Sequence, residues 1–310
     1  MRAMIQDEYG PLSEVLSISE VERPIPADDE VLVRVHAASI HIGDCHGMRG
    51  VPYLMRPIFG LRRPKARVPG TDLAGVVEEV GSAVTGFKPG DEVFGSGKGA
   101  FAEYACAPTE KLLPKPPDLS FEDAAAVGVS ATTALVGIRD KGHAAAGQHV
   151  LVNGASGGVG TYAVQVAKSL GAEVTGVCST SHVELVRSIG ADHVIDSTQE
   201  DFTEGGPRYD LILDNVGNHS FADTRRALKP DGLLLSNGAP VDGWIGGLDH
   251  VIAAMVQSFV SRQQGRPFVV LGTPEQFADV VQLVESGAMR PVIDRTYPLD
   301  QGADAINHVV

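Results

Sequence analysis

The feature that most constrains the fold is a glycine-rich turn between a buried strand and a helix. Gly154-Ala-Ser-Gly-Gly-Val-Gly160 follows the apolar run Val150–Val152 and precedes an apolar helical pattern from Thr161 to Leu170. A turn with so few side chains lets backbone N–H groups approach a pyrophosphate, and the helix N-terminus adds its positive dipole. The pattern approximates GxGxxG with Ala155 at the first glycine position. It predicts a dinucleotide site formed by Ala155, Ser156, Gly157, Gly158, Val159 and Gly160.

Strands and helices alternate on both sides of this turn. A helix is expected to begin at Ser120, with Asp123 completing a near capping box. The later runs are strand 174–177, helix 183–189, strands 194–195 and 211–213, helix 221–228, strand 233–235, strand 268–271, helix 274–286 and a closing strand near Val292. Such alternation predicts an α/β fold with a Rossmann doubly wound parallel sheet.

The part before Ser120 is β-rich. Runs 31–36 and 75–81 are bounded by small residues, 87–94 is a turn leading into a strand, and Pro114, Pro116 and Pro117 close the region. We therefore expect two domains. Residues 1–122, completed by 266–310, form a β-rich domain, and residues 123–265 form the dinucleotide-binding domain.

Other functions fit the same turn and are weighed against it. Gly154-Ala-Ser-Gly-Gly158 matches the G-x-S-x-G nucleophile elbow of α/β-hydrolases, with Ser156 as nucleophile. The additional Gly160, the β-rich region upstream and the lack of an HGGG segment count against a hydrolase. A glycine turn that binds nothing is the other alternative. Short-chain reductases are excluded, because no tyrosine is followed by lysine four positions later.

The second strand of the dinucleotide fold indicates which cofactor is bound. An acidic residue at its end binds the ribose hydroxyl of NAD, and its absence leaves room for the 2′-phosphate of NADP. Here the strand ends at Cys178 and is followed by Ser179, Thr180, Ser181 and His182, with Arg187 one helical turn further on. This favours NADPH over NADH. Asn215, Val216, Asn237 and Gly238 are further predicted cofactor contacts.

Composition narrows the possible partners and location. The formal net charge of −14 argues against nucleic-acid binding, since that requires a basic surface. The three cysteines form no CxxC pair, and the N-terminal residues lack the apolar run of a signal peptide. The longest apolar run is too short to span a bilayer. We expect a cytoplasmic protein with no membrane partner.

Several segments together resemble one family. They are Pro69–Val77, Gly81 with Phe87–Val93, Gly99–Tyr104, the Val159-Gly160 turn, Gly190–Asp192 and Asp210–Gly217. Their joint order is similar to that of the medium-chain dehydrogenase/reductases, in the zinc-independent quinone oxidoreductase-like branch. The resemblance implies a GroES-like catalytic domain beside the Rossmann domain, and a homodimer or homotetramer.

The resemblance also bears on zinc. Zinc-dependent members place a cysteine, a histidine and a second cysteine at positions that read here His41 in His41-Ile-Gly-Asp44, Thr71 in Gly70-Thr-Asp72, and a residue near Gly128. The cysteine-rich structural zinc lobe is also missing. No metal is therefore predicted, although His41, Cys45, His46 and Asp72 form a possible alternative site.

Without zinc, the substrate has to be a good hydride acceptor already. We expect hydride transfer from NADPH to a quinone, an enone (an α,β-unsaturated carbonyl) or a similar carbonyl compound, with His41, His46 and Tyr53 as candidate catalytic donors. The alternatives are a zinc-type alcohol dehydrogenase or aldehyde reductase, and a cofactor-binding redox sensor without enzymatic activity.

Two variable segments are harder to interpret. Residues 53–65 mix apolar and basic side chains and are expected to border the substrate entrance, where the basic groups either attract an acidic substrate or are simply solvated. Trp244 and Phe259 are expected to line either an apolar pocket or an oligomer contact.

Overall fold

The computed structural model describes residues 1–238, 263–267, 270 and 272–309. It divides into two compact units, Met1–Val129 with Pro291–Val310, and Ser130–Arg290. The expected divisions lay after residues 122 and 265. The second unit therefore extends to Arg290 instead of ending at residue 265, because helix α9 (Pro274–Glu285) belongs to it. Trp244 and Phe259 lie outside the described residues.

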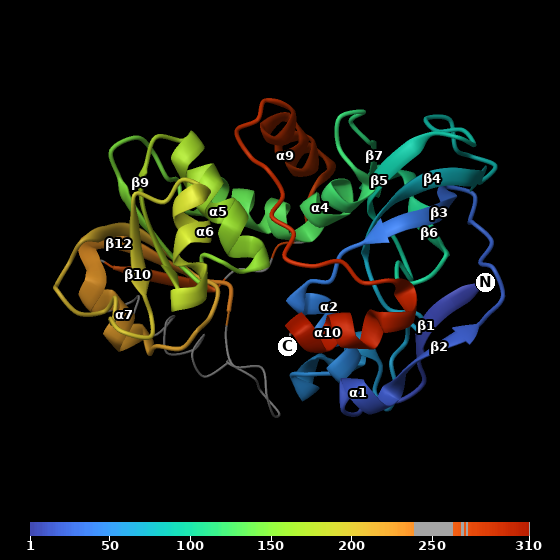
Figure 1. Ribbon diagram of the computed structural model, residues 1–310, viewed down its shortest axis with the longest axis horizontal. Helices are drawn as coiled ribbons and strands as arrows, with labels where there is room; N and C mark the ends of the chain where they lie inside the picture. The colour runs from blue at the N-terminus through green and yellow to red at the C-terminus, as the bar shows by residue number, and fades with distance from the viewer. Residues whose placement is uncertain (239–262, 268–269, 271, 310) are drawn as a thin grey trace. The chain divides into compact units, whose positions relative to one another are not determined.

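The second unit contains a parallel sheet (Figure 1). Its strands are β8 (His149–Asn153), β9 (Glu173–Cys178), β10 (His193–Asp196), β11 (Tyr209–Asp214), β12 (Leu228–Ser236) and β13 (Gln264–Pro267). They lie in the order β10-β9-β8-β11-β12-β13, and every neighbouring pair is parallel. In chain order this is 3-2-1-4-5-6, the strand order of the Rossmann fold. The predicted doubly wound sheet is confirmed.

Helices connect these strands and cover the sheet. They are the second part of α4 (Phe121–Leu135), the π-helical η3 (Val136–Lys141), α5 (Gly158–Ser169), the short η4 (Thr180–His182), α6 (Val183–Ser188), α7 (Phe221–Ala227) and α9. Figure 1 shows α5 and α6 along one face of the sheet and α7 against the other. Leu151, Ile212 and Leu234 from three neighbouring strands are buried in the core with Phe202 and Phe221.

The first unit is built on an antiparallel sheet. Its strands are β3 (Glu30–Ala38), β4 (Asp72–Val80), β5 (Glu92–Ser96), β6 (Tyr104–Pro108) and β7 (Leu112–Pro114), in the order β6-β3-β4-β5-β7. Val33, Leu73, Val77 and Val93 are buried between its strands and the covering loops. The expectation of a β-rich domain from the runs 31–36, 75–81 and 87–94 is thus met by β3, β4 and β5.

A second cluster in the same unit holds its helices. It joins β1 (Arg2–Gln6), β2 (Leu16–Glu20), α1 (Leu12–Val15), α2 (Ile42–Arg49) and α10 (Gly302–Val309), and three further short helices lie nearby: η1 (Tyr53–Met55), α3 (Arg56–Phe59) and η5 (Leu299–Gln301). The 3₁₀ turn η2 (Thr109–Lys111) connects β6 and β7. Met4, Cys45, Met48 and Ile306 are buried at the centre. This packing fixes α2, which contains the predicted catalytic residue His46 and is preceded by a second one, His41, as its N-cap.

The capping signal at Ser120 is confirmed, because the Asp123 N–H donates to Ser120 Oγ at 3.0 Å. One helical stretch in the described part, Phe121–Lys141, is long and apolar enough to cross a membrane. However, 67% of its most apolar window is buried inside the protein, as in the core helix of a globular fold.

The two late strand predictions fared differently. Residues 291–298 adopt no regular structure, so the strand near Val292 is wrong. Pro291 and Pro298 bracket this segment and lack the N–H that a strand donates to its neighbour. The strand predicted for 268–271 falls largely outside the described residues, and the observed strand β13 lies earlier, at Gln264–Pro267.

Candidate functional site

The glycine turn connects the central strand β8 to helix α5. Gly154 has a φ of +76°, which a residue with a side chain rarely adopts. A Cβ on Gly160 would lie 2.0 Å from the Gly154 carbonyl oxygen, so only glycine allows the helix to start this close to the strand. Gly157 begins α5 with extended backbone and without a side-chain cap. The first turn of α5 therefore presents N–H groups that a ligand anion can satisfy.

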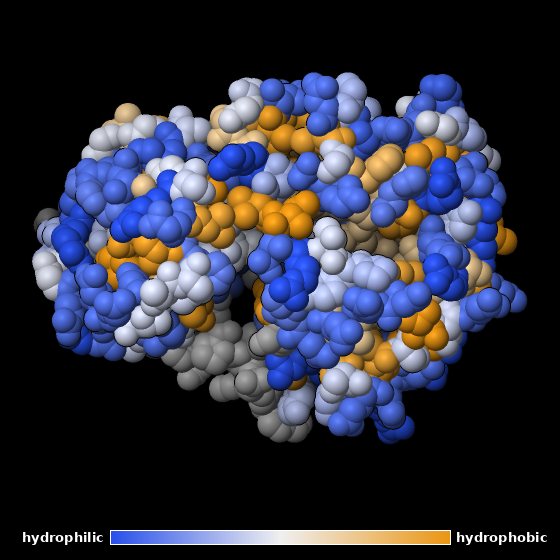
Figure 2. All heavy atoms as spheres, in the orientation of Figure 1, coloured by the Kyte–Doolittle hydropathy of each residue, from blue (hydrophilic) through white to orange (hydrophobic). Residues whose placement is uncertain are grey.

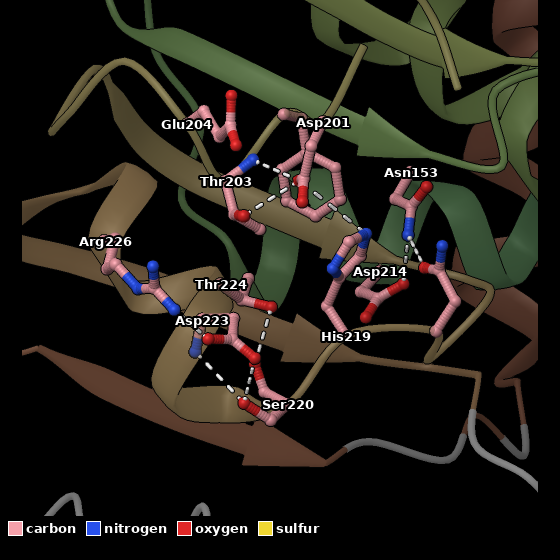
Figure 3. A network of polar contacts seen from close by, with 12 residues as sticks. Asn153, Asp201, Thr203, Glu204, Asp214, His219, Ser220, Asp223, Thr224 and Arg226 are labelled. Carbon is pink, nitrogen blue, oxygen red and sulfur yellow. Dashed lines mark hydrogen bonds and ion pairs between the residues drawn. The ribbon is translucent and has the colours of Figure 1, made fainter. Parts of the chain in front are cut away.

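A buried polar network joins the ends of β8 and β11, the two strands where the strand order reverses. Asn153 and Asp214 point toward each other in Figure 3, and Asn153 Nδ2 donates to Asp214 Oδ1 at 2.8 Å. The same oxygen accepts the backbone N–H groups of Val216 at 3.0 Å and Gly217 at 2.9 Å. Both side chains are only 3% exposed. This carboxylate therefore holds the loop after β11 in position, at the edge where doubly wound folds bind ligands.

The other predicted cofactor contacts gather along the same edge. The Asn215 N–H donates to the Asn153 carbonyl, and Asn215 Oδ1 accepts from Asn237 Nδ2 at 3.0 Å. Val216 is 47% exposed and flanks Gly154. A Cβ added to Gly154 would lie 2.8 Å from Val216 Cγ2. Gly238 packs against Asn215, and a Cβ there would lie 2.2 Å from the Asn215 carbonyl. The structure thus brings three loops together that the sequence predicted separately.

The polar residues after β9 form a cluster of their own. Cys178 is buried, whereas the hydroxyls of Ser179 and Ser181 lie 3.0 and 3.1 Å from His182 Nδ1. Asp196 at the end of β10 pairs with Cys178 in the sheet register, and the sequence argument missed it. Its carboxylate accepts hydrogen bonds from Thr180, Thr198 and Gln199, with Thr180 Oγ1 at 2.7 Å, and the first two of these lower its pKa most.

In the first unit, His41 is the N-cap of α2 and belongs to a closed hydrogen-bonded group. Its Nδ1 accepts from the Asp44 N–H at 3.3 Å, and its Nε2 lies 2.8 Å from Thr71 Oγ1. Thr71 Oγ1 in turn donates to Asp44 Oδ1 at 3.2 Å. Nδ1 acts as an acceptor, so a neutral His41 carries its proton on Nε2 and donates it to Thr71. Both ring nitrogens are therefore engaged within the protein.

Asp72 lies next to this group and fills the space at the Gly128 kink. A Cβ on Gly128 would lie 2.4 Å from the Asp72 carboxyl group, whose oxygens accept from the Val129 N–H at 2.7 Å and from Ser96 Oγ at 3.0 Å. Asp72 is 1% exposed, and its burial raises the pKa of the carboxyl to about 6. The three positions that correspond to zinc ligands in related dehydrogenases thus lie close together. They carry the imidazole of His41, the hydroxyl of Thr71 and, at Gly128, no side chain.

These donors do not fit a catalytic zinc, which takes three protein ligands from histidine, cysteine and carboxylate side chains. The alternative set suggested by the sequence fits no better. Cys45 is fully buried in the core, and the Asp72 carboxyl already accepts from the Val129 N–H and Ser96 Oγ. Within the described ranges, no three histidine, cysteine or acidic side chains are grouped to hold a metal ion.

The other two predicted catalytic residues lie on neighbouring elements. His46 is half-buried in α2, and Tyr53 is 38% exposed in η1. The Arg56 guanidinium stacks over the rings of Tyr53 and Tyr9, at 4.5 and 4.6 Å from their centres.

The Asp72 carboxyl makes stability depend on pH. Because its folded pKa of about 6 lies above its ordinary value of 3.8, its contribution to stability is fully present below about pH 4 and is lost as pH rises through about 6. Asp72→Asn is uncharged, its amide oxygen can still accept from the Val129 N–H, and its Nδ2 can donate to Ser96 Oγ, which reverses the direction of that bond. The free energy of unfolding of Asp72→Asn, measured in urea, should therefore rise relative to that of the natural protein between about pH 4 and pH 6. The difference should reach at most about 3 kcal/mol at pH 7.

The half-buried Asp91 serves as the control, because its hydrogen bond with Lys88 lowers the pKa of its carboxyl. Asp91→Asn should give no gain over the same pH range. If the Asp72→Asn advantage were the same at every pH, the assignment of the raised pKa to Asp72 would be wrong.

The hydrolase alternative finds no support in the described residues. Ser156 follows β8 as a nucleophile elbow requires, but its hydroxyl makes no hydrogen bond to any described residue, and no described histidine or acidic side chain is paired with it.

Comparison with known proteins agrees with the two-unit fold. The family model for the alcohol dehydrogenase GroES-like domain matches residues 27–117, and that for a zinc-binding dehydrogenase matches residues 189–309. A chloroplastic quinone-oxidoreductase homolog of Spinacia oleracea is 32% identical, with 100% of this chain and 95% of that protein covered. The chloroplast envelope quinone oxidoreductase homolog of Arabidopsis thaliana is 34% identical, with 98% and 93% covered.

Solved structures are similar over the whole chain. The quinone oxidoreductase from Coxiella burnetii has a TM-score of 0.86 at 26% identity and covers 100% of this chain and 95% of its own. The Escherichia coli quinone oxidoreductase complexed with NADPH has a TM-score of 0.83 at 25% identity, with 99% and 95% covered.

Proposed function

We propose a function from one premise: this chain belongs to the quinone oxidoreductase-like branch of the medium-chain dehydrogenase/reductase family. It is an NAD(P)H-dependent oxidoreductase. We propose that it transfers hydride from NADPH to an acceptor that is already electron-poor, such as a quinone or an α,β-unsaturated carbonyl, without zinc. Two observations carry the proposal: the glycine turn at the strand-order reversal of the second unit, and the three converging positions of the first unit that lack zinc ligands.

The residues at the edge of the parallel sheet fit a dinucleotide. Gly157, Gly158, Val159 and Gly160 would face its pyrophosphate, since no side chain of their own caps α5. Ala155 and Ser156 shape the turn, and Asn215, Val216, Asn237 and Gly238 form the loops beside it. Bound NADPH supplies a hydride, which the acceptor takes up together with a proton.

The preference for NADPH rests on the end of β9. No carboxylate stands at Cys178, Ser179 or Ser181, and Arg187 on the following helix is exposed. Asp196 is the nearest acidic group in the register, and hydrogen bonds from Thr180, Thr198 and Gln199 occupy its oxygens. A solved relative was complexed with NADPH, which supports the same choice.

Zinc-free transfer is supported by the donor set of the first unit. A carbonyl substrate that is not already electron-poor needs a Lewis acid to polarise it. At the positions of the zinc ligands, this chain has only the side chains of His41 and Thr71, and these are hydrogen-bonded to each other. We therefore propose that His41 positions Thr71 and α2, and that His46 and Tyr53 remain the candidates for contacting the acceptor.

Cofactor titration combined with an acceptor panel tests this function. We expect tighter binding of NADPH than of NADH, NADPH oxidation with quinones or enones, and the same rates in metal-stripped and zinc-supplemented protein. Zinc-dependent activity on simple alcohols would favour the alcohol dehydrogenase alternative. Cofactor binding without turnover on any acceptor would favour a redox sensor.

Within the same experiment, Ser179→Asp places a carboxylate where NAD-specific folds carry one. Its NADPH affinity should fall about tenfold or more, while its NADH affinity is kept, because the added charge repels the 2′-phosphate. Ser188→Asp adds the same charge to an exposed position on α6 and should change neither affinity. Unchanged NADPH binding in Ser179→Asp would place the 2′-phosphate elsewhere.

We further propose a cytoplasmic location and a homodimer or homotetramer. The three cysteines are buried and unpaired, which suits a reducing compartment, although the two plant relatives named above are chloroplastic. Light scattering of the purified protein measures the oligomeric state.

A further inference from the structure

The segment 51–71 of the first unit differs in charge from the rest of the chain. It contains five basic residues (Arg56, Arg62, Arg63, Lys65 and Arg67) and no acidic one. The whole chain has 39 acidic and 25 basic residues, so this basic stretch stands in a strongly acidic protein. Such a local reversal of charge attracts an anionic surface that the remainder of the molecule repels.

The same segment exposes an unusual number of apolar side chains. Figure 2 shows hydrophobic residues as separate patches among hydrophilic ones on the face in view. Among the described residues, nine large apolar side chains are exposed, and four of them lie between Tyr53 and Leu61. Leu54, Ile58 and Leu61 are 58%, 61% and 70% exposed. Leu54 and Ile58 are four residues apart in helical backbone, so they lie on one side of it.

The backbone beneath these side chains is tied to the unit. Tyr9 donates its hydroxyl proton to the Gly60 carbonyl at 2.8 Å, and Arg56 donates to the Gly50 carbonyl at 3.2 Å. The Lys65 N–H donates to the Phe59 carbonyl at 2.7 Å. The apolar side chains are thus presented on a structured platform.

The basic groups differ in how far they are neutralised. Arg67 pairs with Asp7 at 2.6 Å, and Arg63 also lies close enough to lower the pKa of Asp7. Arg62 is exposed and forms no hydrogen bond or ion pair with a described residue. A groove of about 590 Å³ begins beside Ile58 and is lined by Phe59, Lys65, Arg67 and Val68 among others. Apolar and basic surface is therefore continuous here.

We propose that the segment 54–65 docks this protein onto the surface of an anionic lipid bilayer. Leu54, Ile58 and Leu61 would enter the boundary between headgroups and acyl chains, and Arg62, Arg63 and Lys65 would contact the lipid phosphates. Exposed leucine-type side chains beside unpaired arginine are the two features that interfacial segments combine. This departs from the expectation that the protein has no membrane partner, and it is independent of the proposed function.

Vesicle co-sedimentation of the full chain tests the proposal without any turnover. Vesicles of phosphatidylcholine alone are compared with vesicles of equal parts phosphatidylglycerol and phosphatidylcholine, at low and high salt. Binding is expected to the anionic vesicles at low salt and to weaken at high salt. Leu54→Ser/Ile58→Ser should reduce binding about tenfold or more, and Arg62→Gln/Arg63→Gln should reduce both the binding and its salt dependence.

Matched controls come from the same unit. Ile25→Ser changes an apolar side chain that is 89% exposed outside the segment, and Lys88→Gln/Lys111→Gln removes two charges elsewhere. Neither should alter binding. The thermal midpoints of all variants check that they are folded, and Leu61→Ser replaces any variant that is not.

Three outcomes would overturn the proposal. The natural protein could fail to bind anionic vesicles, or the controls could lose as much binding as the segment variants. In the third, the segment variants would leave vesicle binding unchanged. A changed oligomeric mass would then make the segment a subunit contact, and a changed KM for an anionic acceptor would make it a substrate entrance. Vesicle binding is measured without cofactor or acceptor, so a failure of the proposed function is recognised separately, by the cofactor titration and acceptor panel.

Discussion

Gly160→Ala is expected to lower the affinity for NADPH by at least about a hundredfold, which corresponds to about 2.7 kcal/mol. The new Cβ would lie 2.0 Å from the Gly154 carbonyl oxygen and 2.8 Å from Ala155 Cα. Both obstacles are backbone atoms, so no side-chain rotation relieves the contact. Helix α5 has to move away from β8, and the N–H groups of its first turn leave the position that a pyrophosphate requires.

The same substitution should also destabilise the protein without cofactor, because the helix packs on the strand in either state. Gly157→Ala is the matched control in the same turn, since a Cβ there meets nothing closer than 3.4 Å. It should leave the free energy of unfolding of the cofactor-free protein, measured in urea, within about 0.5 kcal/mol of the natural value and weaken only NADPH binding. Equal behaviour of the two variants would show that crowding between α5 and β8 does not set the geometry of the turn.

Asp214→Ala should cost about 3–5 kcal/mol in the free energy of unfolding. The change removes the side-chain acceptor of the Val216 and Gly217 N–H groups and one of the two acceptors of the Asn153 amide, which keeps Asn218 Oδ1. Asp214 is 3% exposed, so water replaces the lost acceptor poorly. Asp214→Asn keeps one oxygen and should lose less. Urea unfolding with and without NADPH measures both the stability and the loss of the cofactor-binding loop.

Asp201 provides the comparison, because it belongs to the same region in Figure 3 but lies at the surface. It accepts from the Thr203 N–H and hydroxyl at 2.8 Å, and its side chain is 42% exposed. Asp201→Ala should cost about 1 kcal/mol or less. If Asp214→Ala were as stable as Asp201→Ala, the loop after β11 would have to be held by other contacts.

Where the sequence predicted well, the physical signal was local. The runs 150–152, 174–177 and 211–213 are apolar because strands in a parallel sheet are buried on both faces, and they became β8, β9 and β11. Ser120 and Asp123 form their cap within one helical turn. The strand expected near Val292 does not form. An apolar run becomes a strand only where a neighbouring strand pairs with it, and Pro291 and Pro298 on either side lack the backbone N–H that such pairing uses.

The candidate site divides in the same way. The roles of Asn153 and Asp214 were missed, although each is a polar residue that ends a buried strand, a signal that could have identified them. Thr71 was considered only as a position without a zinc ligand, and its hydrogen bonds to His41 and Asp44 connect residues about 30 positions apart. The local sequence contains no signal that these residues lie within hydrogen-bonding distance of each other.

The glycine turn, the strand–helix alternation and the acid-free end of the second strand were determined by the sequence itself, because sterics at Gly160 and burial of short apolar runs act between near neighbours. Only the tertiary structure decided that His41 is engaged by Thr71, that Asp72 fills the space at Gly128, and that Asp214 anchors the loop beside the turn. Each of these depends on atoms brought together across the chain by packing, where burial and hydrogen bonding fix what a side chain can do.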